Sequence, residues 1–235
     1  VADSDIMVNY TPFGHSDWQT IVSDVKSFGS AGMKTAVVST INGDANVPFY
    51  KELGNQGVSS SDIPVIAFSV GEEELSGLGT KPLVGHLAAW NYFMSVDEDV
   101  NHEFIAKWKS FIKDDNRVTN DPMEAHYIGF NMWIKAVEKA GTTEANAVQD
   151  AIIGVTTPNL SGGVSAMMPN HHITKPVLIG EIQSDGQFET VWSTSGLVAG
   201  DAWSDFLPGS KDLVADWRGP LSCGNYNVKT AKCSG

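Results

Sequence analysis

The stretch KTAVVSTINGDANVPFYKEL, from Lys34 to Leu53, decides the fold class of this 235-residue chain. It begins with Thr35 to Thr40, a run of small and β-branched residues typical of a strand buried on both faces. Asn42-Gly43-Asp44 interrupts the run, and residues at helical spacing follow it. Pro48 fits the first turn of that helix, where a missing N–H group removes no hydrogen bond. The stretch therefore predicts a strand, a glycine turn and a helix, which is the half-unit of an α/β fold.

The same pattern recurs one unit later in the chain. Pro64 to Val70 is a second apolar run, which passes through Gly71 into Glu72-Glu73-Glu74. Small ligands of α/β proteins bind at the carboxyl ends of parallel strands, beside helix N-termini that carry unpaired N–H groups. We therefore predict a ligand-binding site at these two strand ends. Its candidate residues are Asn42, Gly43, Asp44, Ser69, Val70, Gly71 and Glu72.

The surrounding sequence predicts the rest of a parallel βα layer. We expect a strand at Val8–Pro12, a helix opened by a capping box of Ser16 and Gln19, and a third apolar strand at Val84–Phe93. Residues 5–93 then follow the order β-α-β-α-β-α-β, a parallel sheet wrapped by helices.

The pattern becomes helical after residue 95. We expect helices over 97–113, from Asp121 to Gly141 and over 145–153, with Asp121 as the cap of the second helix and Pro122 at its first position. The apolar stripe of that helix is expected to face the core, and so are two nearby tryptophans. These residues are Met123, Tyr127, Phe130, Ile134, Val137, Trp108 and Trp133.

Strands return in the last part of the pattern. Val164–Met167 and residues 176–182 are apolar, and Asp185-Gly186 predicts a hairpin that leads into a strand at Phe188–Trp192. Beyond residue 195 the composition is typical of a loop.

Composition and motifs exclude several functions. A net charge of −13 and a pI near 4.7 disfavour nucleic acid and anionic membrane surfaces as partners. The sequence contains no apolar run of about 18 residues, the length that would predict a membrane-spanning segment, so we expect no direct membrane insertion. The neighbours His15, Ser16 and Asp17 cannot form a catalytic triad, and His171-His172 lacks further zinc ligands. We therefore predict no enzyme, no metal site and no cofactor.

Two cysteines, Cys223 and Cys233, lie close together in a Gly/Asn/Lys/Ser-rich tail. This spacing predicts a disulfide that closes a short loop, which implies an oxidising compartment. Two free thiols on a disordered tail are the alternative.

Three stretches resemble urea-binding proteins of ABC importers, which are relatives of short-chain amide-binding proteins in the type I periplasmic-binding-protein family. These stretches are TPFGHSD (Thr11–Asp17), INGDANVPFYKEL together with FSVGEEEL, and NHHITKPVLIGEIQSDGQF (Asn170–Phe188). VTNDPMEAHYIGFNMWIKAVEKAG (Val118–Gly141) also fits the family, and the resemblance covers residues 8–208.

The resemblance implies an α/β, type I periplasmic-binding-protein fold of two lobes that trap a ligand between them. Residues 5–95 and 176–235 would form an incomplete second lobe, residues 96–175 would be a helical return into the first lobe, and most of the N-terminal lobe would be absent. The implied function is the substrate-binding component of a periplasmic ABC importer. It would capture urea or a short-chain amide by lobe closure and deliver it to the membrane subunits.

Alternatives remain at two levels. A branched-chain amino-acid-binding protein of the same fold and a cytoplasmic amide-sensing regulator are the rival functions. At the level of residues, the acidic triplet at Glu72 suits the first turn of any helix, and Asp44 could simply cap the helix that starts at Ala45. Trp90 and Tyr92 could line the pocket, but core packing is the interpretation that we adopt.

Overall fold

The computed structural model describes residues 2–201, 209, 226–227 and 232–233. The chain divides into two units, Val1–Gly200 and Asp201–Gly235. In the second unit, the described residues form two short antiparallel strands, β8 (Tyr226–Asn227) and β9 (Lys232–Cys233). The predicted pairing of Cys223 with Cys233 lies outside the described residues.

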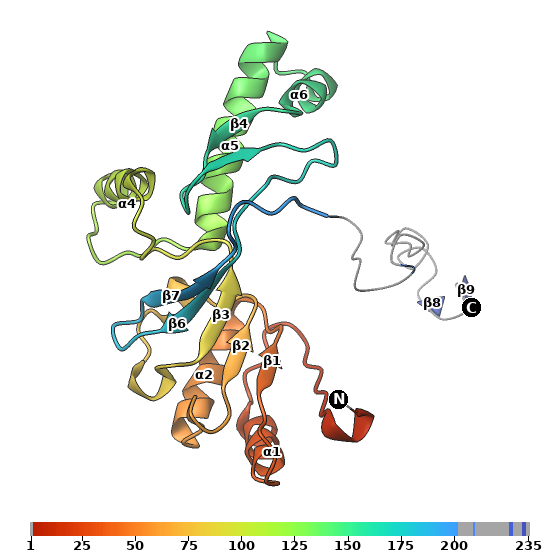
Figure 1. The fold of residues 1–235 in the computed structure, drawn as a ribbon, viewed down its shortest axis with the longest axis vertical. Coiled ribbons are helices and arrows are strands. Elements are labelled where there is room, and N and C mark those ends of the chain that lie inside the picture. Colours follow the sequence, from red (N-terminus) through yellow and green to blue (C-terminus); the bar gives the residue numbers. More distant parts are fainter. Residues whose placement is uncertain (1, 202–208, 210–225, 228–231, 234–235) are drawn as a thin grey trace. The chain divides into compact units, whose positions relative to one another are not determined.

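A five-stranded sheet with the order β1-β2-β3-β6-β7 organises the first unit (Figure 1). Its strands are β1 (Val37–Ser39), β2 (Val65–Ala67), β3 (Leu87–Trp90), β6 (Leu178–Ile182) and β7 (Phe188–Ser193). The first three strands pair in parallel, and β6 and β7 add in antiparallel orientation. The predicted α/β class, the three apolar strands and the hairpin at Asp185-Gly186 are confirmed.

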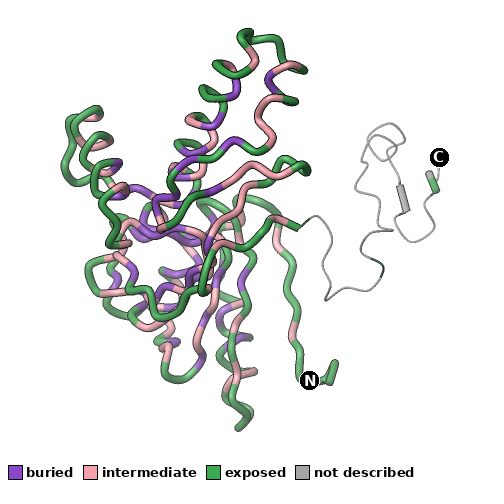
Figure 2. The backbone as a smooth tube through the Cα atoms, turned by 45° about the horizontal axis from the view of Figure 1, so that its top comes forward, coloured by how far each residue is buried: buried purple, intermediate pink, exposed green. Residues whose placement is uncertain are grey.

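Three α-helices accompany the parallel strands: α1 (Gln19–Gly29), α2 (Asn46–Asn55) and α3 (Glu72–Leu75). Short 3₁₀ turns lie at η1 (Asp3–Asp5), η2 (Gly43–Ala45) and η3 (Lys81–Leu83). The apolar sides of α1 and α2 pack with the strands into one core, which contains Trp18, Val22, Phe49, Tyr50, Leu53, Val65, Ala67, Phe93 and Phe188. Figure 2 shows this buried interior. Burial of each large apolar side chain there contributes about 1.5–3 kcal/mol. We call this part the sheet half.

The remaining elements of the unit form a helical half. They are α4 (Asp99–Ile112), α5 (Asp121–Ala140), α6 (Ala145–Ile152) and the antiparallel pair β4 (Thr156–Pro158) and β5 (Val164–Ala166). A small core holds α5 against α6, through Ile128, Met132, Ala136, Val148 and Val155. Glycine at position 141, with φ +67°, ends α5 in the left-handed conformation.

Three chain segments connect the two halves, and we call this junction the crossover (Figure 1). Residues 91–98 lead from β3 to α4, residues 174–177 lead into β6, and residues 194–198 leave β7. Hydrogen bonds join them to one another: Asn91 Nδ2 donates to the Pro176 carbonyl at 2.6 Å, and Thr194 N donates to the Val177 carbonyl at 2.9 Å. Hydrogen bonds between neighbouring segments therefore hold the three segments of the crossover together.

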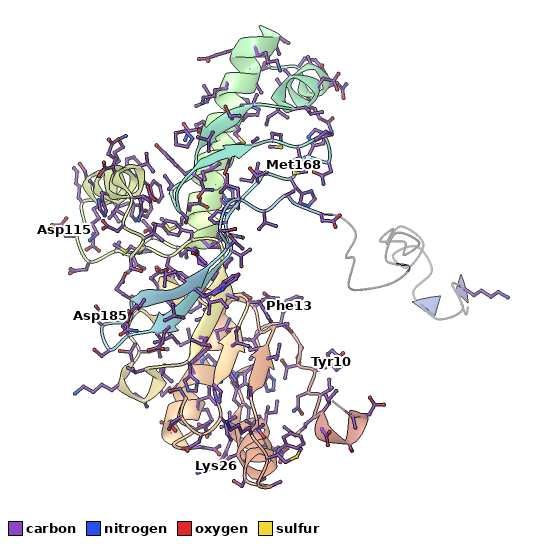
Figure 3. The ribbon with its side chains drawn as sticks, viewed as in Figure 1. Tyr10, Phe13, Lys26, Asp115, Met168 and Asp185 are labelled. Carbon is purple, nitrogen blue, oxygen red and sulfur yellow. The ribbon has the colours of Figure 1, made fainter. Side chains whose placement is uncertain are left out.

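Two predictions near the N-terminus are wrong. Val8–Pro12 is irregular rather than a strand, and α1 starts at Gln19 after Trp18, without the capping box of Ser16 and Gln19. An alternating apolar pattern forms a strand only when a partner strand pairs with it. Tyr10 on this segment and Phe13 just after it are 95% and 90% exposed, and Figure 3 labels both side chains.

The predicted stripe of α5 is correct at its two ends, where Met123 and Val137 pack against buried clusters, and wrong in its middle. Phe130 and Trp133 are 60% and 43% exposed and stack on each other at 5.8 Å between ring centroids, while Ile128 and Met132 are buried. The cap is also one residue earlier than predicted, because Asn120 Oδ1 accepts from Met123 N at 3.1 Å. On α4, Phe111 is likewise exposed.

Candidate functional site

The turns that follow β1 and β2 lie side by side, as predicted from their strand ends. Ser39 and Ala67 are register partners, so the two chains leave the sheet together. Ser69 Oγ then donates to Asn42 Oδ1 at 2.7 Å and lies 3.0 Å from the Ile41 carbonyl. We call residues 41–44 and 69–72 the strand-end rim.

Asn46 holds the two turns of the rim together. Its buried Nδ2 lies 3.0 Å from the Ile41 carbonyl, 3.3 Å from that of Gly43 and 3.1 Å from that of Ser69. Sequence reasoning missed this residue. The signal was an Asn at the start of a helix directly after a turn with a positive-φ glycine, Gly43 at +61°.

The exposed part of the rim is polar and acidic. Asn42, Gly43 and Asp44 face solvent. Asp44 does not cap the helix, because α2 starts at Asn46 and its N-cap residue, Ala45, provides no side-chain bond. The carboxylate of Asp44 is therefore not needed for helix capping, which leaves it free to accept hydrogen bonds from a ligand.

The second turn brings the rim close to α5. Gly71 N donates to Glu74 Oε2 at 2.9 Å, which closes the first turn of α3. A Cβ atom added at Gly71 would lie 3.4 Å from Trp90 Cζ3 and 3.5 Å from Asn120 Cβ, the cap of α5. The rim therefore meets the N-terminus of the longest helix in the other half.

Glu72 lies below this surface rather than on it. Its side chain is 1% exposed, and Oε1 accepts from Met94 N at 2.6 Å. Burial raises the pKa of the carboxyl to about 8, against the lowering effect of that hydrogen bond. Val70 is also buried, in the main core. Of the seven predicted residues, the structure thus exposes three, half-buries Ser69, and buries Val70, Gly71 and Glu72.

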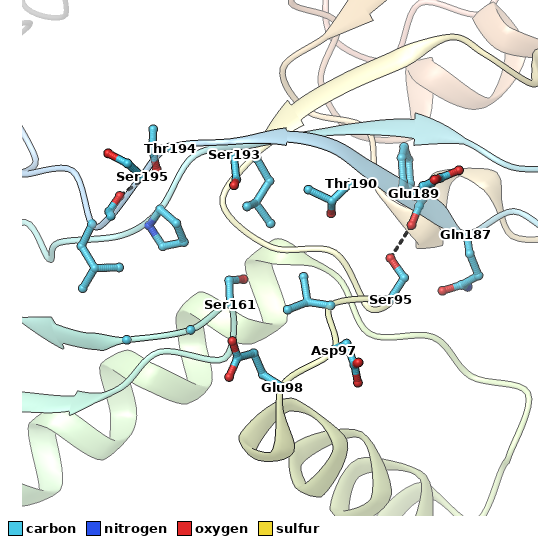
Figure 4. A pocket seen from close by; sticks show the side chains of 18 of the residues that line it. Ser95, Asp97, Glu98, Ser161, Gln187, Glu189, Thr190, Ser193, Thr194 and Ser195 are labelled. Atoms are coloured by element: carbon cyan, nitrogen blue, oxygen red, sulfur yellow. Dashed lines mark hydrogen bonds between the residues drawn. The ribbon is translucent and has the colours of Figure 1, made fainter.

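Two cavities lie near these elements. One, of about 950 Å³, borders the crossover and contains hydroxyl and carboxylate side chains, including Ser95, Glu98, Ser161, Glu189 and Thr190 (Figure 4). The other, of about 910 Å³, lies between β1, α1 and the N-terminal segment, and reaches the rim at Asn42. In the described part of the chain, no three His, Cys, Asp or Glu side chains gather closely enough to hold a metal ion.

Comparison with known proteins gives one family. A family model described as "Periplasmic binding protein domain" matches residues 2–209. Among curated proteins, a limonene hydroxylase of Geobacillus stearothermophilus is 31% identical over 117 residues, which is 50% of this chain and 21% of that protein. No helix among the described residues has the length and apolar character needed to cross a membrane.

Solved structures share the fold. A solute-binding protein of an ABC transporter from Rhodopseudomonas palustris HaA2, in complex with p-hydroxybenzoic acid, superimposes with a TM-score of 0.67 at 20% identity, over 78% of this chain and 50% of that chain. A branched-chain amino acid ABC transporter periplasmic ligand-binding protein from Burkholderia xenovorans LB400 gives 0.61 at 15% identity, over 78% and 49%. The chain therefore spans about half the length of these structures.

Proposed function

The chain belongs to the periplasmic binding protein family, and from this premise we propose that it is the substrate-binding component of an ABC importer. Its ligand is urea or a short-chain amide, captured outside the cytoplasm and handed to the membrane subunits of the importer. In this proposal residues 5–95 and 176–235 belong to one lobe and residues 96–175 return into the other. The ligand site is the strand-end rim.

The contact between Asn42 and Ser69 carries this proposal. It joins two strand-end turns into one polar surface, and Gly71 lets that surface approach the cap of α5 closely. Urea has one carbonyl acceptor and N–H donors in excess. The exposed carboxylate of Asp44 matches the donors, and amide or backbone N–H groups match the carbonyl.

The charge of the rim favours a neutral ligand over an anion. Segments 41–44 and 69–72 contain no Lys or Arg, and their exposed charged residue is Asp44, because Glu72 is buried. A benzoate carboxylate, as in the solved relative, would meet like charge here. A branched-chain amino acid is the second candidate, supported by the Burkholderia relative. Its ammonium suits an acidic rim, but its carboxylate has no cationic partner on these turns.

Capture follows from the two-half architecture. A small solute that touches both sides of a cleft binds the closed state better than the open one, so it shifts the population toward closure. An analogue that leaves one buried polar group unpaired loses about 1–3 kcal/mol.

Calorimetry on the intact protein tests the proposal. We expect binding of urea or acetamide, and much weaker binding of leucine and of 4-hydroxybenzoate. Asp44→Ala should weaken the preferred ligand at least tenfold, about 1.4 kcal/mol, with little change in stability since Asp44 caps no helix. Asp24→Ala, on the exposed side of α1, is the control. Tight leucine binding without amide binding would replace the first candidate with the second.

The rival in a different functional class is a cytoplasmic amide sensor. A disulfide between Cys223 and Cys233, found by mass spectrometry of the native protein, would argue for the oxidising compartment that the importer requires. Fully reduced cysteines in native protein would favour the sensor.

A further inference from the structure

Four charged side chains lie together at the crossover, three of them buried and one partly buried, and the proposed binding function uses only one of them. They are Glu72, Asp121, Glu124 and Lys175, and we call them the crossover cluster. Lys175 Nζ donates to Glu124 Oε2 and lies 3.8 Å from Asp121 Oδ2. Glu72 and Glu124 are 1% and 0% exposed.

The cluster draws on both halves of the unit and on the segments between them. Glu72 is in α3 of the sheet half, and its Oε1 accepts from Met94 N of the first crossover segment. Asp121 and Glu124 are in the first turn of α5, in the helical half, and Asp121 Oδ2 accepts from Asn91 N at 3.0 Å. Lys175 is on the second segment, which pairs with Val198 of the third. Any change in the angle between the halves must therefore move these groups relative to one another.

The charges in the cluster do not balance. Three carboxylates face one ammonium group, so full ionisation leaves an excess of two negative charges in a buried space. Glu72 Oε2 and Glu124 Oε1 are buried and, among the described residues, have no hydrogen-bond partner. An ionised oxygen in such a place is costly, and like charges repel strongly where water is excluded. Uptake of one proton by Glu72 removes the negative charge beside its unpaired oxygen and lowers the excess from two negative charges to one, which weakens the repulsion.

We propose that the crossover cluster is a proton-operated hinge, in which a bound proton holds the sheet half and the helical half together and its loss drives them apart. The repulsion acts across the junction, because Glu72 and Asp121 belong to opposite halves and interact electrostatically. The other groups that face Glu72 are Glu74 and the hydroxyl of Tyr92. The exposed ion pair of Arg117 and Glu73, at 3.4 Å, is an attraction that opposes this repulsion, and solvent weakens it.

Three groups face Glu124. Lys175 and Asp121 interact with its charge directly, and the charge of Glu124 also raises the pKa of Tyr92. Burial raises the pKa of Glu124 to about 7 despite Lys175, and that of Glu72 to about 8. The proton is therefore exchanged near neutral pH. If the proposed function holds, the hinge makes ligand capture by closure stronger at acidic pH; that consequence rests on the proposed function, while the hinge itself does not.

The hinge can be tested without any ligand, so its failure is separate from a failure of the proposed function. Spin labels are attached to Ser27→Cys on α1 and Gln149→Cys on α6, both exposed, with Cys223 and Cys233 replaced by Ser. Pulsed electron resonance then gives the distance distribution between the two halves. In the wild-type background we expect a narrow distribution at pH 5.5 that broadens toward longer separations at pH 9.

Glu72→Gln mimics the protonated carboxyl, so its distribution should stay narrow at both pH values. The control is Glu138→Gln on α5, an exposed glutamate outside the crossover cluster, which should broaden at pH 9 as the wild type does. A wild-type distribution that does not change with pH, or a Glu72→Gln protein that still broadens, overturns the proposal. If Glu72→Gln does not fold, ¹³C NMR of the carboxyl groups in the unsubstituted protein decides: titration of Glu72 at the ordinary value of glutamate also overturns it.

Discussion

At the residue scale, a few buried polar side chains position the rim, and Asn46 is the clearest of them. One amide group reaches three backbone carbonyls that come from two different turns. No regular secondary structure pairs these carbonyls, so the buried amide of Asn46 is the group that ties the two turns together. The shape of the rim therefore depends on this side chain more than on the residues that would touch a ligand.

Replacement of this side chain tests that dependence. Asn46→Ala should lower the free energy of unfolding by about 1–3 kcal/mol, since each lost hydrogen bond contributes about 1 kcal/mol. The measurement is unfolding in guanidinium chloride, because urea is the proposed ligand. Asn55→Ala, exposed in the same helix, should change stability by less than about 0.5 kcal/mol. Equal effects of the two variants would mean that Asn46 does not hold the turns.

The pKa of Glu72 gives a prediction of pH-dependent stability. Its carboxyl has a pKa of about 8 in the folded protein against an ordinary value of 4.5, so the folded state binds the proton more tightly than the unfolded state. The stability from this group is fully present below pH 4.5 and is lost as the pH rises to about 8. Over that range the loss is roughly 5 kcal/mol, at about 1.4 kcal/mol for each unit of pKa.

Thermal unfolding between pH 4.5 and 9 measures this loss. Glu72→Gln cannot ionise, so the difference in stability between variant and wild type should shift steadily in favour of the variant as the pH rises. The slope is the readout, because a buried amide changes the absolute stability at every pH. Parallel curves for the two proteins would show that Glu72 has an ordinary pKa.

At the element scale, α5 shows how far the sequence determines packing. Its length and its stop at Gly141 were predicted from local rules and hold, and its start was predicted to within one residue. The face of α5 that packs inward was not predicted correctly, because both sides of the helix are apolar enough to be buried. Ile128, Met132 and Ala136 face α6, and the aromatic side with Phe130 and Trp133 does not.

Two substitutions distinguish the faces of α5. Met132→Ala should lower the free energy of unfolding by about 2–5 kcal/mol, since it empties a fully buried position. Phe130→Ala, on the exposed side, should cost less than about 1 kcal/mol. Thermal unfolding of both variants is the measurement, and the reverse order of effects would restore the stripe that the sequence predicted.

The same limit explains the other differences between prediction and structure. The apolar runs of β1, β2 and β3 were recognised because a buried strand needs them, whereas Val8–Pro12 has an equally suitable pattern but no partner strand in the structure. The position of the rim followed from the rule for strand ends. The burial of Glu72 in the crossover cluster could not be predicted from the sequence, because segments about a hundred residues apart, such as those of Glu72 and Lys175, create that environment.

At the scale of the whole molecule, the rim and the crossover both connect the sheet half to the helical half. The rim ends against the cap of α5, through Gly71 and Asn120, and the crossover connects the same two halves. A ligand between the rim and the helical half would link them directly. Its binding would then favour the closed arrangement that a proton at the crossover also favours.

A crystal structure of the intact protein with bound urea or acetamide tests the central claim most directly. The account predicts a ligand oxygen or nitrogen within hydrogen-bond distance, about 2.7–3.2 Å, of Asp44 or of the turn from Ser69 to Gly71. A ligand that lies more than about 5 Å from both turns of the rim, beyond any hydrogen bond, would contradict it.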